Sequence, residues 1–341
     1  MVRYASHMKS LRLIALVTLF ALGACGGSDE SQGPVNTLER GLPTDPESLD
    51  HHKARSTQAA EVLRDIGEGL TAYSATGELV PAAAESWDIS EDGLTYTFNL
   101  RDELRWSNGE PLTAQDFVVG MRRLVTPATA AVYAEMLIDI ENAAGIISGD
   151  IPASMLGVEA PDDRTLVLRL VQPTPYLLGL LSHPSTFPIH AASVDAHGDG
   201  FARPGKLVSN GAYRLDAWVP GSIISLKRNE HYWNNAGTAI DAVNYHVLVQ
   251  DRSELNRYRA GELHITSTVP AESFAQLRED LGDQLHVAPY LGVYYYGLNL
   301  TKEPFRDNLA LREALSMAID REELATSVLG RGEKPAYSWV P

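Results

Sequence analysis

Hydrophobic and polar residues alternate in several short segments of this chain. Residues 94–101 carry Leu, Tyr, Phe and Leu at every second position, with Thr, Thr, Asn and Arg between them. A period of two is typical of a strand that buries one face. Residues 87–90 precede this strand across Glu91-Asp92-Gly93, so we predict a hairpin. Further strands are predicted at 165–171, 221–227, 263–266 and 287–300.

Other segments have the apolar spacing of helices. A turn at 107–109 precedes Thr113, which can cap a helix whose third residue is Asp116. One face of that helix carries the apolar residues Phe117, Val118, Met121 and Leu124. Further helices are predicted at 252–260, 271–281, 309–319 and, between the capping residues Asp320 and Gly330, 321–329. This mixture predicts an α/β protein, with mixed α and β structure in several lobes.

The N-terminus has the pattern of an export signal. Residues 13–24 form an unbroken apolar run that follows Lys9 and Arg12 and ends directly before Cys25. This order is typical of a secretory signal peptide, and the run is shorter than the roughly 18 to 20 apolar residues that span a bilayer. We therefore predict a signal peptide at 1–24 and a flexible, glycine-rich tether at 25–35.

The end of this signal predicts a lipid anchor. The tetrapeptide Leu22-Gly23-Ala24-Cys25 resembles the lipobox of bacterial lipoproteins, in which the cysteine is lipidated and becomes the new N-terminus. Each buried methylene of a lipid chain contributes about 0.8 kcal/mol, so several chains on Cys25 would hold the protein to a membrane. The alternative is a soluble exported protein in which this cysteine is incidental.

Composition excludes some classes of protein. The chain has 28 basic and 44 acidic residues, a net charge of −16, and it becomes more acidic once the signal is removed. Such a charge argues against nucleic acid as a partner. Cys25 is the only cysteine, so no disulfide can form within the chain. The length suggests two or more domains.

Candidate catalytic and metal-binding patterns lack required features. Gly200, Gly205 and Lys206 have the spacing of a phosphate-binding loop, but leucine follows where Ser or Thr would hold magnesium. Proline residues exclude a single helix that would align His183, His190 and His197. His51 and His52 lack the spacing of a helical metal pair, so we interpret them as part of a solvated loop. We therefore predict a protein that is not an enzyme and has no metal site.

Tyrosines gather in the predicted strand at 287–300. Tyr290, Tyr294, Tyr295 and Tyr296 would project to both of its faces. A buried tyrosine needs a partner for its hydroxyl, whereas several at a sheet edge would suit a ligand cleft. Both interpretations stay open from the residues alone.

A series of motifs resembles the family-5 extracellular solute-binding proteins, which serve peptide and nickel ABC importers. The motifs begin with 83–87 (AAESW), 93–101 (GLTYTFNLR) and 106–117 (WSNGEPLTAQDF). They continue through 209–213, 228–233, 256–262 and 294–299, and the resemblance extends from Asn36 to Pro341. Segments 132–134, 182–185 and 334–338 look closest to the oligopeptide-binding and murein-peptide-binding members.

The resemblance implies a hinged, three-lobed fold. Lobe I would consist of 36–67 and 190–288, lobe II of 68–189, and an incomplete lobe III of 289–341. Family members are longer, so the chain looks cut at its C-terminus. In the oligopeptide binders, the aspartate that pairs with the α-amine of the peptide would lie beyond Pro341.

The resemblance also implies ligand-binding residues. Arg55, Ser56 and Thr57 match the lobe I segment that hydrogen-bonds the peptide backbone. Tyr133 matches a lobe II tyrosine that faces the ligand, and Tyr290 and Tyr295 match tyrosines at the start of lobe III. Ser267 and Thr268 complete the set of eight implied ligand-binding residues. They take positions where the oligopeptide binder has larger residues.

The implied function is peptide import. We expect a monomeric, lipid-anchored substrate-binding protein on the periplasmic or cell-envelope side, which delivers oligopeptides to a membrane ABC permease and its ATPase subunits, without a cofactor. Alternatives within the family are receptors for murein tripeptide, dipeptide, haem, nickel or sugar. An exported hydrolase that uses the same cleft is the alternative from another class.

Overall fold

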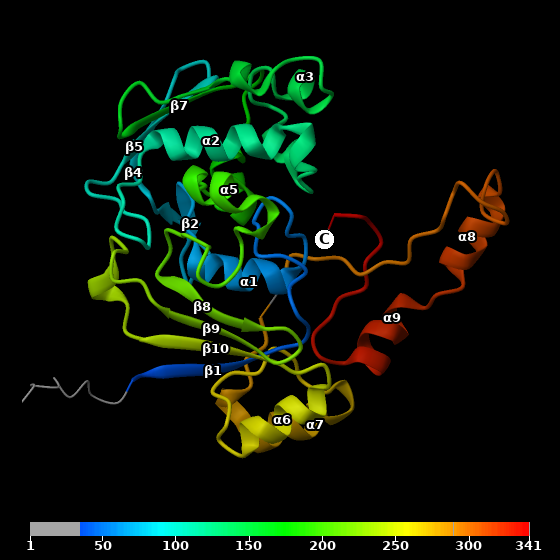
Figure 1. Ribbon diagram of the computed structural model, residues 1–341. Coiled ribbons are helices and arrows are strands. Elements are labelled where there is room, and N and C mark those ends of the chain that lie inside the picture. The colour runs from blue at the N-terminus through cyan, green and yellow to red at the C-terminus, as the bar shows by residue number, and fades with distance from the viewer. Residues whose placement is uncertain (1–34, 289, 341) are drawn as a thin grey trace, which may run out of the picture. The chain divides into compact units, whose positions relative to one another are not determined.

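The computed structural model describes residues 35–288 and 290–340 (Figure 1). It contains two four-stranded sheets, one two-stranded sheet and a series of helices. The predicted mixture of α and β structure in several parts is therefore confirmed. The predicted signal peptide, most of the tether, and Cys25 lie outside the described residues. None of the helices in the described ranges is long and apolar enough to cross a membrane.

The first four-stranded sheet combines the beginning of the described chain with a segment far along it. Its strands are β1 (Thr37–Leu42), β10 (Ala242–Val247), β9 (Ile223–Arg228) and β8 (Tyr213–Val219), in that spatial order. The strand β1 pairs with β10 in parallel, and the other pairs are antiparallel. Helix α1 (Thr57–Ile66) runs along this sheet (Figure 1). A hydrophobic core forms between them, because α1 buries one apolar face against Ile224, Leu226 and Val243.

The second four-stranded sheet is antiparallel and carries a separate core. Its spatial order is β4 (Ala84–Ile89), β5 (Thr95–Leu100), β7 (Thr165–Arg169) and β6 (Val158–Glu159). The predicted hairpin is confirmed, with Ile89 opposite Tyr96 in its register. Helix α2 (Ala114–Val125) packs against this sheet and buries Phe117, Met121 and Leu124.

The start of α2 confirms the predicted capping box. The backbone N–H and the hydroxyl of Thr113 both donate to Asp116 Oδ2, at 2.8 and 3.2 Å. These bonds satisfy groups at the helix N-terminus that have no partner within the helix. Gly109 supplies the turn before it with φ of 87°, a conformation that glycine adopts without steric cost.

The chain passes between the two cores at residues 67–70 and again near 187–190. The first passage is tightly held. Glu68 N–H donates to Asn210 Oδ1 at 3.1 Å, and Asn210 Nδ2 donates to the Glu68 carbonyl at 2.8 Å. A Cβ atom on Gly69 would collide with the backbone oxygen of Leu181. The division into three lobes at the predicted boundaries stays a prediction.

Smaller elements complete the region of the two cores. These elements are β2 (Thr71–Tyr73), β3 (Leu79–Pro81), α3 (Ala143–Ile147), α4 (Leu177–Leu180) and α5 (Ala191–His197). His190 precedes α5, and a one-turn 3-10 helix at Pro184–Thr186 follows His183. The three histidines at seven-residue spacing therefore do not share a helix, as the prolines predicted.

The later helices occur close to their predicted positions. They are α6 (Asp251–Arg259), α7 (Phe274–Leu281), α8 (Leu309–Met317) and α9 (Arg321–Glu323), with a 3-10 turn at Ala271–Ser273 before α7. The Asp320 side chain accepts from Glu323 N–H at 2.9 Å, which confirms the predicted cap. A π-helical stretch at Leu324–Leu329 continues α9 and ends at Gly330, whose φ is 62°.

Two predicted strands are wrong. Residues 263–266 form one isolated bridge with β1, between Arg40 and Ile265, with backbone hydrogen bonds from His264 N–H to the Glu39 carbonyl and from Gly41 N–H to the Ile265 carbonyl, and they are not part of a strand. Residues 287–300 form no strand among those described, and their tyrosines are exposed. Alternation favours a strand only where a second strand supplies hydrogen-bond partners, and no described strand pairs with this segment.

Candidate functional site

A pocket of about 390 Å³ lies beside α1, from Thr57 to Arg64. It is lined by the segment that leads into α1, by one face of that helix, by Tyr133, by residues 183–185 and by Tyr290. Five of the eight predicted ligand-binding residues line it together: Arg55, Ser56, Thr57, Tyr133 and Tyr290. A cavity of this size falls in the usual range for small ligands.

Glu47 fixes the segment at the start of α1. One carboxylate oxygen accepts from the backbone N–H groups of Arg55 and Ser56, the latter at 2.9 Å, and the other accepts from the Ser56 hydroxyl at 2.5 Å. Ser56 also caps the helix, because its Oγ accepts from Ala59 N–H at 3.1 Å. Burial alone would raise the pKa of Glu47, but these hydrogen bonds outweigh it and lower the pKa. Glu47 therefore stays ionised and holds this wall in place.

A buried ion pair anchors the loop that leads to the same wall. Arg123 of α2 donates to both carboxylate oxygens of Asp50, at 2.9 and 2.7 Å. The Arg123 Nη1 atom also lies 2.6 Å from His52 Nδ1. Burial would raise the pKa of Asp50, but the hydrogen bonds and the charge of Arg123 outweigh it and lower the pKa. The pair joins the loop before α1 to the helix of the second core.

His51 and His52 are buried, so the interpretation of a solvated loop is wrong. Their side chains lie in the interior, next to the ion pair of Asp50 with Arg123. Burial lowers the pKa of His51 to about 4 and that of His52 well below its ordinary value. Both imidazoles are therefore neutral near pH 7.

Tyr133 closes one side of the pocket. Its hydroxyl donates to the backbone oxygen of Arg55 at 3.1 Å, and its ring lies 5.1 Å from the His183 ring in an edge-on arrangement. His183 Nδ1 in turn accepts from Ser185 N–H at 3.2 Å. Tyr133 thus links the segment before α1 to the 183–185 segment in one wall, in addition to any contact with a ligand.

The other three predicted residues lie outside this pocket. Ser267 Oγ donates to the Gly41 carbonyl at 2.6 Å, and Ser267 N–H donates to Glu254 Oε1 at 2.6 Å. The Thr268 hydroxyl lies 3.0 Å from Asp251 Oδ1 and 3.1 Å from Glu254 Oε2. These contacts attach α6 to β1. The exposed Tyr295 ring packs 4.3 Å from the Trp339 ring.

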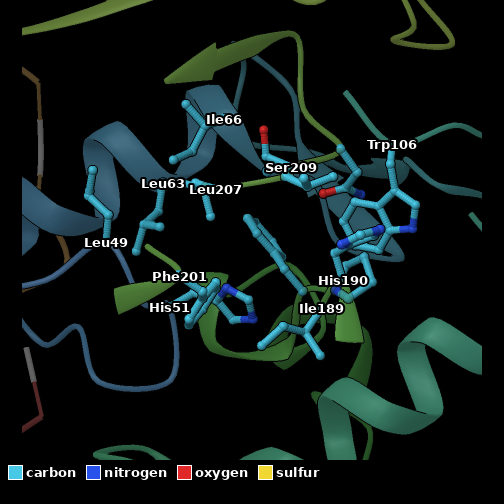
Figure 2. A pocket seen from close by; sticks show the side chains of 15 residues that line it. Leu49, His51, Leu63, Ile66, Trp106, Ile189, His190, Phe201, Leu207 and Ser209 are labelled. Atoms are coloured by element: carbon cyan, nitrogen blue, oxygen red, sulfur yellow. The ribbon is translucent and has the colours of Figure 1, made fainter. Parts of the chain in front are cut away.

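A second cavity, of about 20 Å³, lies between the two cores (Figure 2). Apolar side chains such as Leu63, Ile66 and Phe201 surround it, together with His51 and Ser209. This volume accommodates about one water molecule and excludes a peptide or cofactor. The larger pocket is therefore the candidate ligand site. In the described part of the chain no group of three His, Cys, Asp or Glu residues is placed to hold a metal ion.

Sequence reasoning missed Glu47, Arg64 and the pair of Asp50 with Arg123. The positions of Thr57, Ala60, Glu61 and Arg64 in α1 have the spacing of a helix face, and this signal could have identified Arg64. The other contacts join residues 8 to 73 positions apart, and no local pattern predicts them.

Comparisons with known proteins agree with this fold. Residues 78–341 match the family described as bacterial extracellular solute-binding proteins, family 5 Middle. The periplasmic oligopeptide-binding protein OppA of Escherichia coli is 41% identical over 309 residues, which cover 89% of this chain and 56% of that protein. The periplasmic murein peptide-binding protein MppA of the same organism is 39% identical, with 89% of this chain and 56% of that protein covered.

A solved structure extends the agreement to three dimensions. The crystal structure of Haemophilus influenzae OppA in complex with RPPGFSPFR has a TM-score of 0.87 and 39% identity, over 91% of this chain and 61% of that one. The chain spans little more than half the length of the curated relatives that it matches. The fold and the sequence together confirm the predicted family: the chain belongs to family 5 of the bacterial extracellular solute-binding proteins.

Proposed function

We propose that this protein is the substrate-binding lipoprotein of a peptide ABC importer. It captures oligopeptides and delivers them to a membrane permease that works with ATPase subunits. The observation that carries the proposal is the pocket in which Arg55, Ser56, Thr57, Tyr133 and Tyr290 meet. Membership in a family with oligopeptide-binding relatives supports the choice of ligand.

Recognition of the peptide backbone follows from hydrogen-bond requirements. An extended peptide has N–H and C=O groups that need partners once they are buried, whatever its side chains are. The N–H groups of Arg55 and Ser56 already donate to Glu47, and the Arg55 carbonyl accepts from Tyr133. The groups that this wall offers to a ligand therefore include the Thr57 hydroxyl, the second lone pair of the Arg55 carbonyl, and side chains.

Delivery requires that the binding site open and close. Residues 67–70 and 187–190 are the two passages between the cores and the places where a hinge motion would occur. Ser267, Thr268 and Tyr295 lie outside the pocket. They would contact the ligand only if other parts of the cleft extend the site toward them when it closes. We assign the monomeric protein to the periplasmic or cell-envelope side, in line with the periplasmic names of its relatives.

Binding of intact peptide is the direct test. The full-length mature protein is titrated with tri- and tetrapeptides by calorimetry. The peptide is then recovered, and mass spectrometry determines its mass. We expect saturable binding and unchanged peptide. Cleaved peptide would support the hydrolase alternative, and a lack of binding to every peptide would contradict the proposal.

The lipid anchor is tested separately. We expect the Cys25→Ser variant to leave the membrane fraction, because the acyl chains have no other attachment point. Fractionation of cells that express the wild type and the variant provides the measurement. Equal partitioning of both proteins into membranes would contradict lipidation at Cys25.

A receptor for murein tripeptide is the second candidate within the family. The 39% identity to the murein peptide-binding protein favours it over dipeptide, haem, nickel and sugar. Competition between a murein tripeptide and an ordinary tripeptide of the same length distinguishes the two candidates. A large preference for the murein peptide would replace the oligopeptide assignment.

A further inference from the structure

One face of α1 borders the larger pocket and the opposite face borders the core. The pocket face carries Thr57, Ala60, Glu61 and Arg64. These positions are i, i+3, i+4 and i+7, which follow one stripe of a helix. The core face carries Ala59, Val62, Leu63 and Ile66, all of which are buried. Packing of the core face therefore fixes which side chains α1 presents to a ligand.

The positive charges at this pocket lack partners within the described ranges. The guanidinium groups of Arg55 and Arg64 form no ion pair or hydrogen bond with another side chain there, and both residues are exposed. Glu61, the acidic residue among the lining side chains, pairs instead with Arg40 at 2.9 Å. The pocket thus has two free cationic groups in a chain whose net charge is −16.

His183 adds a neutral donor. Its Nδ1 atom accepts from Ser185 N–H, so in a neutral ring the proton resides on Nε2. Burial, and then the charge of Arg64, lower the pKa of His183, which favours the neutral ring. His183 therefore offers an N–H group to the pocket without a positive charge of its own.

The remaining negative charge near the pocket is already engaged. Glu47 accepts hydrogen bonds from Arg55 N–H, Ser56 N–H and the Ser56 hydroxyl, and it does not line the pocket. Glu47 therefore binds the backbone directly before α1, near the helix N-terminus, where backbone N–H groups attract negative charge. A ligand anion at this pocket would meet the side chains of Arg55 and Arg64, which line it.

We propose that this pocket is a subsite for a carboxylate of the bound peptide, held by Arg55 and Arg64 with His183 as an additional donor. Guanidinium groups match carboxylates in charge and in the geometry of their donors. The protein would therefore bind a peptide that has this carboxylate, on an acidic side chain or at the C-terminus, more tightly than the neutral isostere of that peptide. This inference rests on the proposed peptide-binding function and adds a charge preference to it.

Three tetrapeptides test the preference in the full-length protein. They are Ala-Glu-Ala-Ala, Ala-Gln-Ala-Ala and Ala-Gln-Ala-Ala with an amidated C-terminus, and calorimetry gives their dissociation constants. We expect either the Glu peptide to bind about tenfold more tightly than the Gln peptide, or amidation to weaken binding about tenfold. The first result identifies a side-chain carboxylate and the second identifies the terminal one.

Charge-neutral variants assign the effect to this pocket. We expect Arg64→Gln and Arg55→Gln each to reduce the preference for the carboxylate at least about threefold. Arg214→Gln is the matched control, because Arg214 is an exposed arginine on β8 that does not line the pocket. In the same measurement, Arg214→Gln should have the same preference for the carboxylate as the wild type. Thermal unfolding shows whether each variant is folded.

The outcomes separate this inference from the proposed function. Equal affinity for all three peptides, or a preference that survives both arginine substitutions, would overturn the carboxylate subsite and leave peptide binding intact. An equal loss of preference in Arg214→Gln would show that the preference depends on the overall charge of the protein. That result would also overturn the carboxylate subsite. Failure of every peptide to bind would overturn the proposed function itself.

Discussion

The two cores and the last fifty described residues contrast in how they use apolar side chains. Residues 36–288 bury large side chains such as Trp106, Phe98 and Tyr245 almost completely. In residues 290–340, Ala325 is the buried hydrophobic residue, whereas Leu309, Met317 and Trp339 are exposed. Both regions nevertheless form capped helices, α2 in the first and α8 and α9 in the second. Local helix signals are therefore followed in both regions of the described chain.

The contrast has a physical cause. A helix cap involves groups within a few positions of each other, as in the bonds of Thr113 to Asp116 and of Glu323 to Asp320. A core requires that two or more elements bring apolar faces together. In 290–340 the described elements supply no sheet to cover α8 and α9. The structures of the two regions therefore differ in burial more than in secondary structure.

The largest expected effect concerns a longer form of the protein that reaches the length of the curated relatives. A chain of residues 25–341 should bind tetrapeptides at least about 100-fold more weakly than the longer form. The reason is that the resemblance places the residue that pairs with the peptide α-amine beyond Pro341. Removal of one member of a buried charge pair costs about 3 to 5 kcal/mol. Calorimetry of both forms provides the comparison. Micromolar binding by the shorter chain would show that the described pocket suffices.

Matched leucine substitutions test the difference in burial directly. Leu124→Ala in α2 should reduce the free energy of unfolding by about 2 to 5 kcal/mol, because Leu124 is 0% exposed and its loss leaves a cavity. In a chain of residues 25–341, Leu315→Ala in α8 should change it by less than about 0.5 kcal/mol, because Leu315 is 42% exposed in this chain. Urea unfolding measures both. A large loss from Leu315→Ala would place a core in the second region.

Acid should destabilise the first region through its buried histidines. The pKa of His51 is about 4 in the folded protein, against an ordinary value of 6.5, so the unfolded state binds this proton more readily. Stability is then fully present above pH 6.5 and falls by about 3 kcal/mol as the pH decreases to 4. His52 acts in the same direction.

Urea midpoints between pH 7 and 4.5 reveal this dependence. The His51→Gln variant should lose much of the decrease, because its side chain does not take up a proton in this range. An identical decrease in the variant and the wild type would assign the acid sensitivity to other groups.

The smallest expected effect separates two predicted ligand tyrosines. Tyr133→Phe should lower the free energy of unfolding by about 0.5 to 1.5 kcal/mol, because the hydrogen bond to the Arg55 carbonyl is lost. Tyr295→Phe should leave folding unchanged, since Tyr295 is exposed. If both contact the ligand, each variant also loses about 0.5 to 1.5 kcal/mol of peptide binding. Unchanged affinity in both would remove them from the site.

Much of the local structure was predictable from short stretches of sequence. The hairpin of β4 and β5, the capping box of α2, and the ends of α6 and α7 depend on residues a few positions apart. The family was also predictable, because its motifs occur in order along most of the chain. Five of the eight residues carried over from the resemblance meet in one pocket.

Only the tertiary structure decided which residues are buried and which meet. His51 is buried next to Asp50, whose partner Arg123 lies 73 positions away on α2. The pocket joins α1 to Tyr133, at a similar separation, and to Tyr290, which is much further along the chain. The alternation at 287–300 could not by itself show whether this segment forms a strand, because a strand needs hydrogen-bond partners that lie elsewhere in the fold. Spacing along the chain thus determined the local elements, whereas contacts between distant segments determined the binding pocket.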